Sequence, residues 1–211
     1  MEHAFWTQRW SERQIGFHEG KPNALLAENI ARFEKPKLRV LVPLCGKAED
    51  LAWLAARGHT VTGVEFVPQA IQEFFAEHAL TPARGADGSL AAAGVTLFAG
   101  DFFALDAKTL GTFDLIYDRA ALVALEPSMR ARYVAHCRSL LKPGGAIFLV
   151  AFAYDQTKAP GPPWSVAPRD VEALYAGMRI QTLAERRVST SARLAEAGIE
   201  ALSETAYLIA S

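Results

Sequence analysis

Short apolar runs alternate along this chain with longer stretches of helical periodicity, and that alternation limits the possible folds more than any other feature. Parallel strands need long crossover connections, usually helices, so this order is typical of an α/β sheet. Each apolar run is rich in Val, Leu, Ile or Phe, as expected for strands buried on both faces. The five predicted strands are 38–44, 60–65, 95–101, 113–119 and 146–152.

The connecting stretches carry recognisable helix start and stop signals. Gly58 follows the stretch 48–57 as a C-terminal glycine would, and Pro68 precedes the predicted helix 69–78. The segment 80–94 is rich in Ala, Gly and Pro and is predicted to be a loop. Two further helices are expected at 128–141, ended by Lys142-Pro143-Gly144-Gly145, and at 168–176.

The C-terminal part holds two more strand candidates, 180–187 and 204–210, with no long helix between them. They predict an antiparallel edge on a mostly parallel sheet with helices on both faces, a Rossmann-like α/β fold. Residues 1–35 precede the sheet and look helical, with Trp6, Trp10 and Phe17 on an apolar face. We expect a single domain spanning 1–211, in which 1–35 form a lid on a core at 36–211.

Composition excludes several classes of function. The 211 residues are 51% hydrophobic and 21% charged with a net charge of -1, which gives no electrostatic footprint for nucleic acid. Cys45 and Cys137 lack the spacing of a zinc site, so no metal is expected. The N-terminus lacks the apolar stretch of a signal peptide, and no apolar run is long enough for a membrane span. A reducing cytoplasm is the expected compartment.

Ligands of open α/β sheets bind beyond the carboxyl ends of the strands. Leu44 and Gly46 follow the first strand, and a glycine there lets the backbone approach a ligand closely. Glu65 ends the second strand 19 residues after Gly46 and can accept hydrogen bonds from both ribose hydroxyls. After the third strand, Asp101 can face an adenine amine and Phe102 can stack on the ring.

The turn after the first strand contains one glycine and no GxGxxG pattern. The pyrophosphate of a dinucleotide needs the close backbone contact that a GxGxxG turn provides. The turn in this chain therefore favours a nucleoside cofactor without phosphates. S-adenosylmethionine is the common cofactor of this kind. Lys142-Pro143-Gly144-Gly145 ahead of an apolar strand supports the same interpretation.

Five segments of the chain are distinctive. They are FWTQRW…IGFHEGKPN (5–23), VLVPLCGKAEDLAWLAARGHTVTGVE (40–65), GDFFAL (100–105), YDRAALVAL (117–125) and YDQTKAPGPPWSV (154–166). With these segments the chain resembles the thiopurine S-methyltransferase family over nearly its full length. The match at VPLCGK is specific, because this turn departs from the usual glycine-rich turn of methyltransferases.

The resemblance implies a class I methyltransferase fold whose N-terminal segment closes over S-adenosylmethionine. It implies cofactor contacts from Trp10, Leu44, Glu65 and Arg119, with Phe102 in the adenine pocket. It also places an arginine near the substrate, at Arg186 or Arg187 in this chain.

The expected chemistry is methyl transfer to a soft nucleophile held in line with the methyl group. Arg119 can stabilise a thiolate, although pairing with Asp118 or Glu65 is an alternative role. Aromatic rings attract a sulfonium, and Phe17 and Trp164 are candidates beside His18 on the substrate side. Cys45 stands at a helix N-terminus, where a thiol pKa would be lowered, but the reaction needs no covalent intermediate.

The leading hypothesis is a monomeric S-methyltransferase for small aromatic or heteroaromatic thiols such as thiopurines. Selenium or tellurium oxyanions, thiocyanate and halide are alternative acceptors. A protein that binds the cofactor without turnover is the alternative outside enzymes. A nucleic-acid methyltransferase is disfavoured, because Gly161-Pro162-Pro163-Trp164 lacks the polar residue that would bind a base amine.

Overall fold

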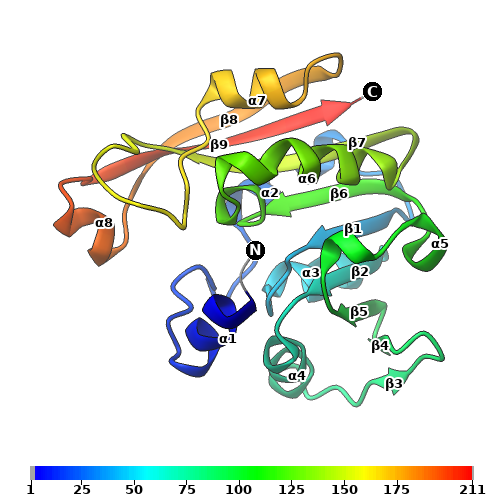
Figure 1. Cartoon of the computed structure of the whole chain (residues 1–211). Coiled ribbons are helices and arrows are strands. Elements are labelled where there is room, and N and C mark those ends of the chain that lie inside the picture. Colours follow the sequence, from blue (N-terminus) through cyan, green and yellow to red (C-terminus); the bar gives the residue numbers. More distant parts are fainter. Residues whose placement is uncertain (1–2, 211) are drawn as a thin grey trace. The chain divides into compact units, whose positions relative to one another are not determined.

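A computed structural model describes residues 3–210 of the chain (Figure 1). Met1 and Glu2 of the expected lid and Ser211 of the expected core lie outside the described residues. The chain forms two compact units, Met1–Leu115 and Ile116–Ser211. Together they give an α/β fold with a mostly parallel central sheet.

The first unit carries the predicted alternation of strands and helices. Every strand and long helix predicted for this unit is present, within a few residues of its expected ends. Its elements are α1 (His3–Ser11), α2 (Ala24–Asn29), η1 (Ile30–Arg32), β1 (Arg39–Pro43), α3 (Glu49–Ala56), β2 (Thr60–Glu65), α4 (Pro68–Glu77), β3 (Ala83–Arg84), β4 (Leu90–Ala92), β5 (Val95–Ala99), η2 (Phe102–Ala104) and α5 (Ala107–Leu110).

The sheet of the first unit has the strand order β3-β4-β5-β2-β1. β2 is parallel to β1, with Val61 opposite Val40, and parallel to β5, with Val64 opposite Phe98. α3 and α4 both contact β2 and β5. The carboxyl ends of β1, β2 and β5 therefore meet at one edge of this sheet.

The segment 80–94 differs from the predicted loop. Residues of β3 pair antiparallel with β4, and β4 pairs antiparallel with β5, placing Leu90 opposite Leu97. The short strands contain mostly Ala, which has little β propensity, so pairing with the predicted strand β5 decides their conformation.

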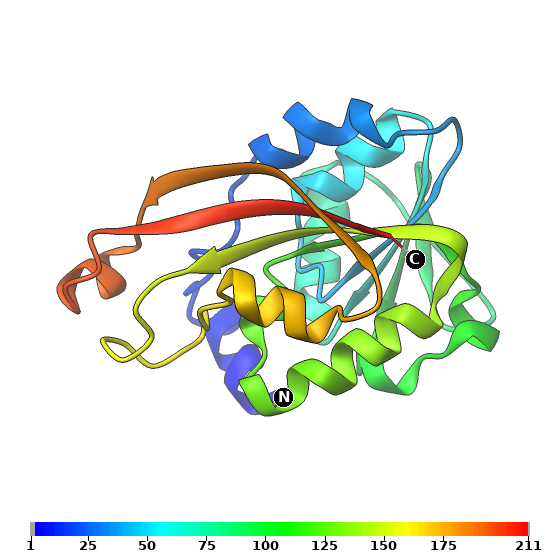
Figure 2. The ribbon, with the colours of Figure 1, turned by 90° about the horizontal axis from the view of Figure 1, so that it is seen from above.

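The second unit begins within β6 (Phe113–Arg119) and continues in the strand order β6-β7-β9-β8. β9 pairs antiparallel with both β7 and β8, and α8 forms the tip of the β8–β9 hairpin (Figure 2). The remaining elements are η3 (Leu122–Ala124), α6 (Pro127–Ser139), β7 (Leu141–Ala153), α7 (Pro168–Leu174), β8 (Arg179–Ser189), α8 (Ala192–Glu196) and β9 (Ala201–Ala210).

β7 is longer than its predicted range 146–152. It begins at Leu141, so the Lys142-Pro143-Gly144-Gly145 segment lies within the strand and not in a turn before it. Across the described residues, every helix is too short or too polar to traverse a lipid bilayer.

Candidate functional site

The turn after β1 is tied to the end of β2 by the Glu65 carboxylate. Its Oε2 accepts the amide hydrogen of Gly46 at 2.7 Å, and its Oε1 accepts that of Val67 at 2.8 Å. Leu44 and Gly46 have φ angles of 49° and 54°, the left-handed region that costs a non-glycine residue free energy. The strained backbone of Leu44 thus lies in the turn where the sequence predicts a bound ligand.

Burial shapes the chemistry of Glu65. The residue is 6% exposed, and burial raises the pKa of its carboxyl, while amide hydrogen bonds from Val67 and Gly46 oppose the rise. The Phe66 amide also hydrogen-bonds this carboxylate, so backbone amides take three of its about four lone-pair directions. The remaining direction can accept a hydroxyl hydrogen, such as that of a ribose hydroxyl. The residues at this turn therefore fit a nucleoside cofactor.

The N-terminal segment folds onto the same turn. Trp10 is 1% exposed and packs with Val67 and Ala70, next to Phe17. The ring centroids of Trp10 and Phe17 are 5.9 Å apart. A Cβ atom added to Gly46 would lie 3.2 Å from Cζ2 of Trp10, so the indole covers the glycine closely. The structure brings Trp10, Gly46 and Phe17 together, as a lid would.

Two cations join the N-terminal segment and the turn after β1 to α4: Arg13 from the segment and the buried Lys47 from the turn. Lys47 Nζ lies 3.0 Å from Glu73 Oε2 and 2.5 Å from Glu77 Oε1, and Arg13 Nη1 contacts Glu73 Oε1 at 2.7 Å. Burial alone would lower the pKa of Lys47, but hydrogen bonds to Glu77 and Glu73 raise this pKa above its usual value. Sequence reasoning missed this network, because nothing in the order of residues pairs Arg13 or Lys47 with α4.

His18 lies beside this network. Its ring, the Glu49 carboxylate and the Glu77 carboxylate each offer a ligand atom within 4.8 Å of the others. Glu77 already contacts the Lys47 ammonium, and the Glu49 carboxylate lies 3.2 Å from Nε2 of His78. These contacts place His18 in a charged network at the base of the N-terminal segment.

Asp101 and Phe102 follow β5 beside the end of β2. The amide of Gly100 donates to the Glu65 carbonyl at 2.9 Å, which brings this segment next to the predicted ribose contact. Asp101 is exposed and caps η2 by accepting the Phe103 amide hydrogen at 3.0 Å. Phe102 is 2% exposed, so its ring packs inside the first unit.

Arg119 and Trp164 belong to the second unit. Arg119 is half-buried at the last position of β6. The Trp164 amide donates to the Val123 carbonyl at 2.6 Å, which ties the loop before α7 to the segment after Arg119. The Trp164 ring lies directly over the backbone of Gly161, where there is no room for a side chain.

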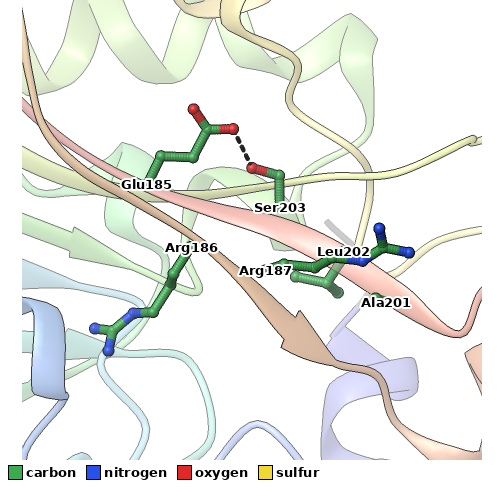
Figure 3. Close-up of a pocket in the computed structure, with 6 residues that line it drawn as sticks. All are labelled: Glu185, Arg186, Arg187, Ala201, Leu202 and Ser203. Carbon is green, nitrogen blue, oxygen red and sulfur yellow. Dashed lines mark hydrogen bonds between the residues drawn. The ribbon is translucent and has the colours of Figure 1, made fainter.

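The two candidate arginines of β8 point in different directions, as alternation along a strand requires (Figure 3). Arg186 is half-buried and its Nε lies 3.3 Å from Oε2 of Glu204, whereas Arg187 is exposed. They line a 430 Å³ pocket together with Glu185, Ala201, Leu202 and Ser203. Only Arg186 is held in place by a buried carboxylate.

The sequence prediction about the Cys45 thiol is wrong. The pKa of the Cys45 thiol is raised well above its usual value, because the thiol is buried and lies near Glu65. The expected helix N-terminal effect is overridden by this loss of solvation.

Comparisons with known proteins identify the family and the fold of the chain. The family model that matches residues 1–211 is described as thiopurine S-methyltransferase (TPMT). The thiopurine S-methyltransferase of Pseudomonas aeruginosa is 42% identical over 215 residues, covering 99% of both chains. That of Xanthobacter autotrophicus is 47% identical over 180 residues, covering 83% of this chain and 84% of its own.

Solved structures share the fold at lower identity. The 1,6-didemethyltoxoflavin N1-methyltransferase of Burkholderia thailandensis, with bound S-adenosylhomocysteine, has a TM-score of 0.64 at 19% identity and covers 97% of this chain and 86% of its own. The magnesium protoporphyrin IX methyltransferase of Synechocystis, also with bound S-adenosylhomocysteine, has a TM-score of 0.62 at 18% identity. It covers 89% of this chain and 80% of its own.

Proposed function

Because the chain belongs to the thiopurine S-methyltransferase family, we propose that it methylates the sulfur of small aromatic or heteroaromatic thiols. The chain is an S-adenosylmethionine-dependent methyltransferase, and the match over residues 1–211 supports its working as one domain. A single observation carries the site assignment: the buried Glu65 carboxylate at the end of β2 is held by the amides of Gly46 and Val67 and so fixes the turn after β1.

The proposed cofactor site uses residues at the carboxyl ends of three strands. Glu65 binds the ribose hydroxyls, and the backbone of Leu44 and Gly46 lies against the nucleoside. Trp10 closes over the turn, and Asp101 with Phe102 borders the adenine. When bound, S-adenosylmethionine supplies a methyl group activated by its positive sulfur.

The remaining task of the protein is to align the acceptor and to exclude water. The thiolate sulfur forms a bond to the methyl carbon while the bond from that carbon to the sulfonium breaks, so no proton has to move in this step. We assign to Arg119 both a contact with the cofactor and stabilisation of the thiolate. Phe17, His18, Trp164 and Arg186 are assigned to the substrate side. Arg187 is exposed and we leave it outside the site.

We propose that the protein is a monomer in the cytoplasm, on the basis of its described surface and its two cysteines. Between residues 4 and 210, no large hydrophobic side chain is exposed, so none of them indicates an interface with a partner protein. Both cysteines are free and buried, as in proteins of a reducing compartment.

The test is methyl transfer from labelled S-adenosylmethionine to a panel containing a thiopurine, an aryl thiol, selenite, tellurite, thiocyanate and iodide. We expect turnover of the aromatic thiols, a loss of at least about tenfold in kcat/KM for Glu65→Gln, and no loss for the exposed Glu126→Gln. Turnover restricted to the inorganic ions would refute the thiol assignment. Cofactor binding without any methylated product would refute turnover itself.

A further inference from the structure

The carboxylate of Asp118 lies at the end of β6, immediately before Arg119. It is 1% exposed, and both of its oxygens accept hydrogen bonds. Oδ1 accepts the amide hydrogen of Leu122 at 3.0 Å, and Oδ2 accepts the hydroxyl hydrogen of Tyr133 at 2.9 Å. The carboxylate thus joins the turn after β6 to α6.

The hydrogen bond to Leu122 closes a short turn of backbone in which Arg119 is the first residue. Within this turn, Ala120 has a φ of 64°, a left-handed conformation that an alanine adopts only under constraint. The Asp118 side chain can hold Ala120 in this conformation, because its hydrogen bond to the Leu122 amide links the backbone before Ala120 to the backbone after it. The direction in which Arg119 leaves the strand therefore depends on this carboxylate.

The groups that face Asp118 come from two helices. Tyr133 and Cys137 lie on α6, and Tyr175 lies at the end of α7. The proximity of Asp118 helps to raise the pKa of all three, after burial, which has the largest effect. Among residues 3–210 the Tyr175 hydroxyl is buried without a hydrogen-bond partner, so removing it breaks no bond that holds the turn.

We propose that Asp118 is a positioning residue that holds Arg119 in its binding conformation through Leu122 and Tyr133. This rests on the proposed role of Arg119 at the cofactor. Hydrogen bonds to an ionised carboxylate are stronger than those to a neutral one, so the turn is held most firmly when Asp118 carries its charge.

The charge of Asp118 changes in an accessible range of pH. Burial raises the pKa of this carboxyl to about 6, although hydrogen bonds from Leu122 and Tyr133 oppose the rise. The charge is present above this pH and is lost below it. Asp118→Asn keeps the shape of the side chain and imitates the protonated state at every pH. Tyr133→Phe removes a bond that favours the charged form, so the transition should move to higher pH.

The experiment measures the Kd of S-adenosylhomocysteine by calorimetry from about pH 5 to pH 8, so that thiol ionisation plays no part. We expect wild-type affinity to fall about three- to tenfold towards pH 5, with a midpoint near the Asp118 pKa of about 6. Asp118→Asn should show the weaker affinity throughout, without a transition, and Tyr133→Phe a raised midpoint. Tyr175→Phe is the matched control and should keep the wild-type profile.

Arg119→Ala separates this inference from the proposed function. If Arg119→Ala weakens binding but Asp118→Asn retains the wild-type affinity and profile, the positioning role is wrong and the role of Arg119 stands. If Arg119→Ala binds like wild type, the assignment of Arg119 is wrong and the positioning role falls with it. Thermal unfolding of each variant shows whether it is folded, and the shifted midpoint of Tyr133→Phe is a result that a merely structural role would not produce.

Discussion

The indole of Trp10 lies against Gly46 so closely that a single added carbon on the glycine would sit 3.2 Å from Cζ2 of the ring. Trp10 belongs to α1, whereas Gly46 belongs to the turn after β1, 36 residues later in the chain. The N-terminal segment therefore packs directly on the turn that fits the cofactor.

Gly46→Ala should weaken cofactor binding beyond its effect on stability. An alanine at a φ of 54° costs about 1–2 kcal/mol of folding free energy, and its methyl group would also push Trp10 away from the turn. Gly177→Ala is the matched control, because Gly177 has a φ of 82° with open space around it. We expect both variants to lose similar stability in urea, and only Gly46→Ala to lose affinity for S-adenosylhomocysteine. Equal affinities would show that the Trp10 contact is irrelevant to binding.

Gly161→Ala should affect the substrate side alone. A methyl group at residue 161 would overlap the Trp164 ring and displace it. If Trp164 borders the thiol, KM for the thiol should rise about threefold or more while KM for the cofactor stays unchanged, and Trp164→Ala should show the same split. A rise in both KM values would instead indicate a general disturbance of the loop.

The free energy of unfolding should also depend on pH through the ionisation of Asp118. Its pKa is about 6 in the folded chain against 3.8 ordinarily, so the folded state binds this proton more tightly than the unfolded chain. The associated stability is complete below pH 3.8 and is lost as pH rises through about 6, by about 3 kcal/mol in total. Urea unfolding between pH 4 and pH 8 should show this fall in wild type and not in Asp118→Asn. Parallel curves for the two proteins would contradict it.

Neither cysteine should react in the folded protein. Cys45 and Cys137 are buried, and burial raises the pKa of both thiols well above the usual value. A chromogenic disulfide reagent at pH 8 should therefore titrate two thiols after unfolding in guanidinium and none before it. Rapid reaction of one thiol in the native protein would show that Cys45 is accessible at the turn.

The sequence predicted the elements marked by apolar runs and by helix start and stop signals, and failed where contacts distant in the chain decide the outcome. β2 was predicted at its observed ends, because its apolar residues stand between a helix-ending glycine and a helix-opening proline. The pairing of Leu90 with Leu97 could not be foreseen from an Ala- and Gly-rich segment. The choice between Arg186 and Arg187 likewise needed the register of β8, which places Arg186 opposite Glu204.

The same limit applies to the site. Glu65 and Gly46 were predicted as site residues from their positions at strand ends, which is a property of the chain order. The environment of Cys45 depends on how tightly the turn packs, and its thiol titrates in the direction opposite to the one expected. Asp118 was visible beside Arg119, but its bond to Tyr133 exists only once α6 has docked on β6.

The N-terminal segment and the turn after β1 both form an ion pair with the same carboxylate, that of Glu73. One carboxylate receives Arg13 from the segment and Lys47 from the turn, and its own helix adds Gln69 at 2.8 Å. Opening of the N-terminal segment removes Arg13 from Glu73, while Lys47 still shares this carboxylate, so the ion pairs of the segment and of the turn are coupled through Glu73. Amide hydrogen exchange would follow this coupling: a ligand that touches only the turn should slow exchange throughout α1, many residues from any atom it contacts.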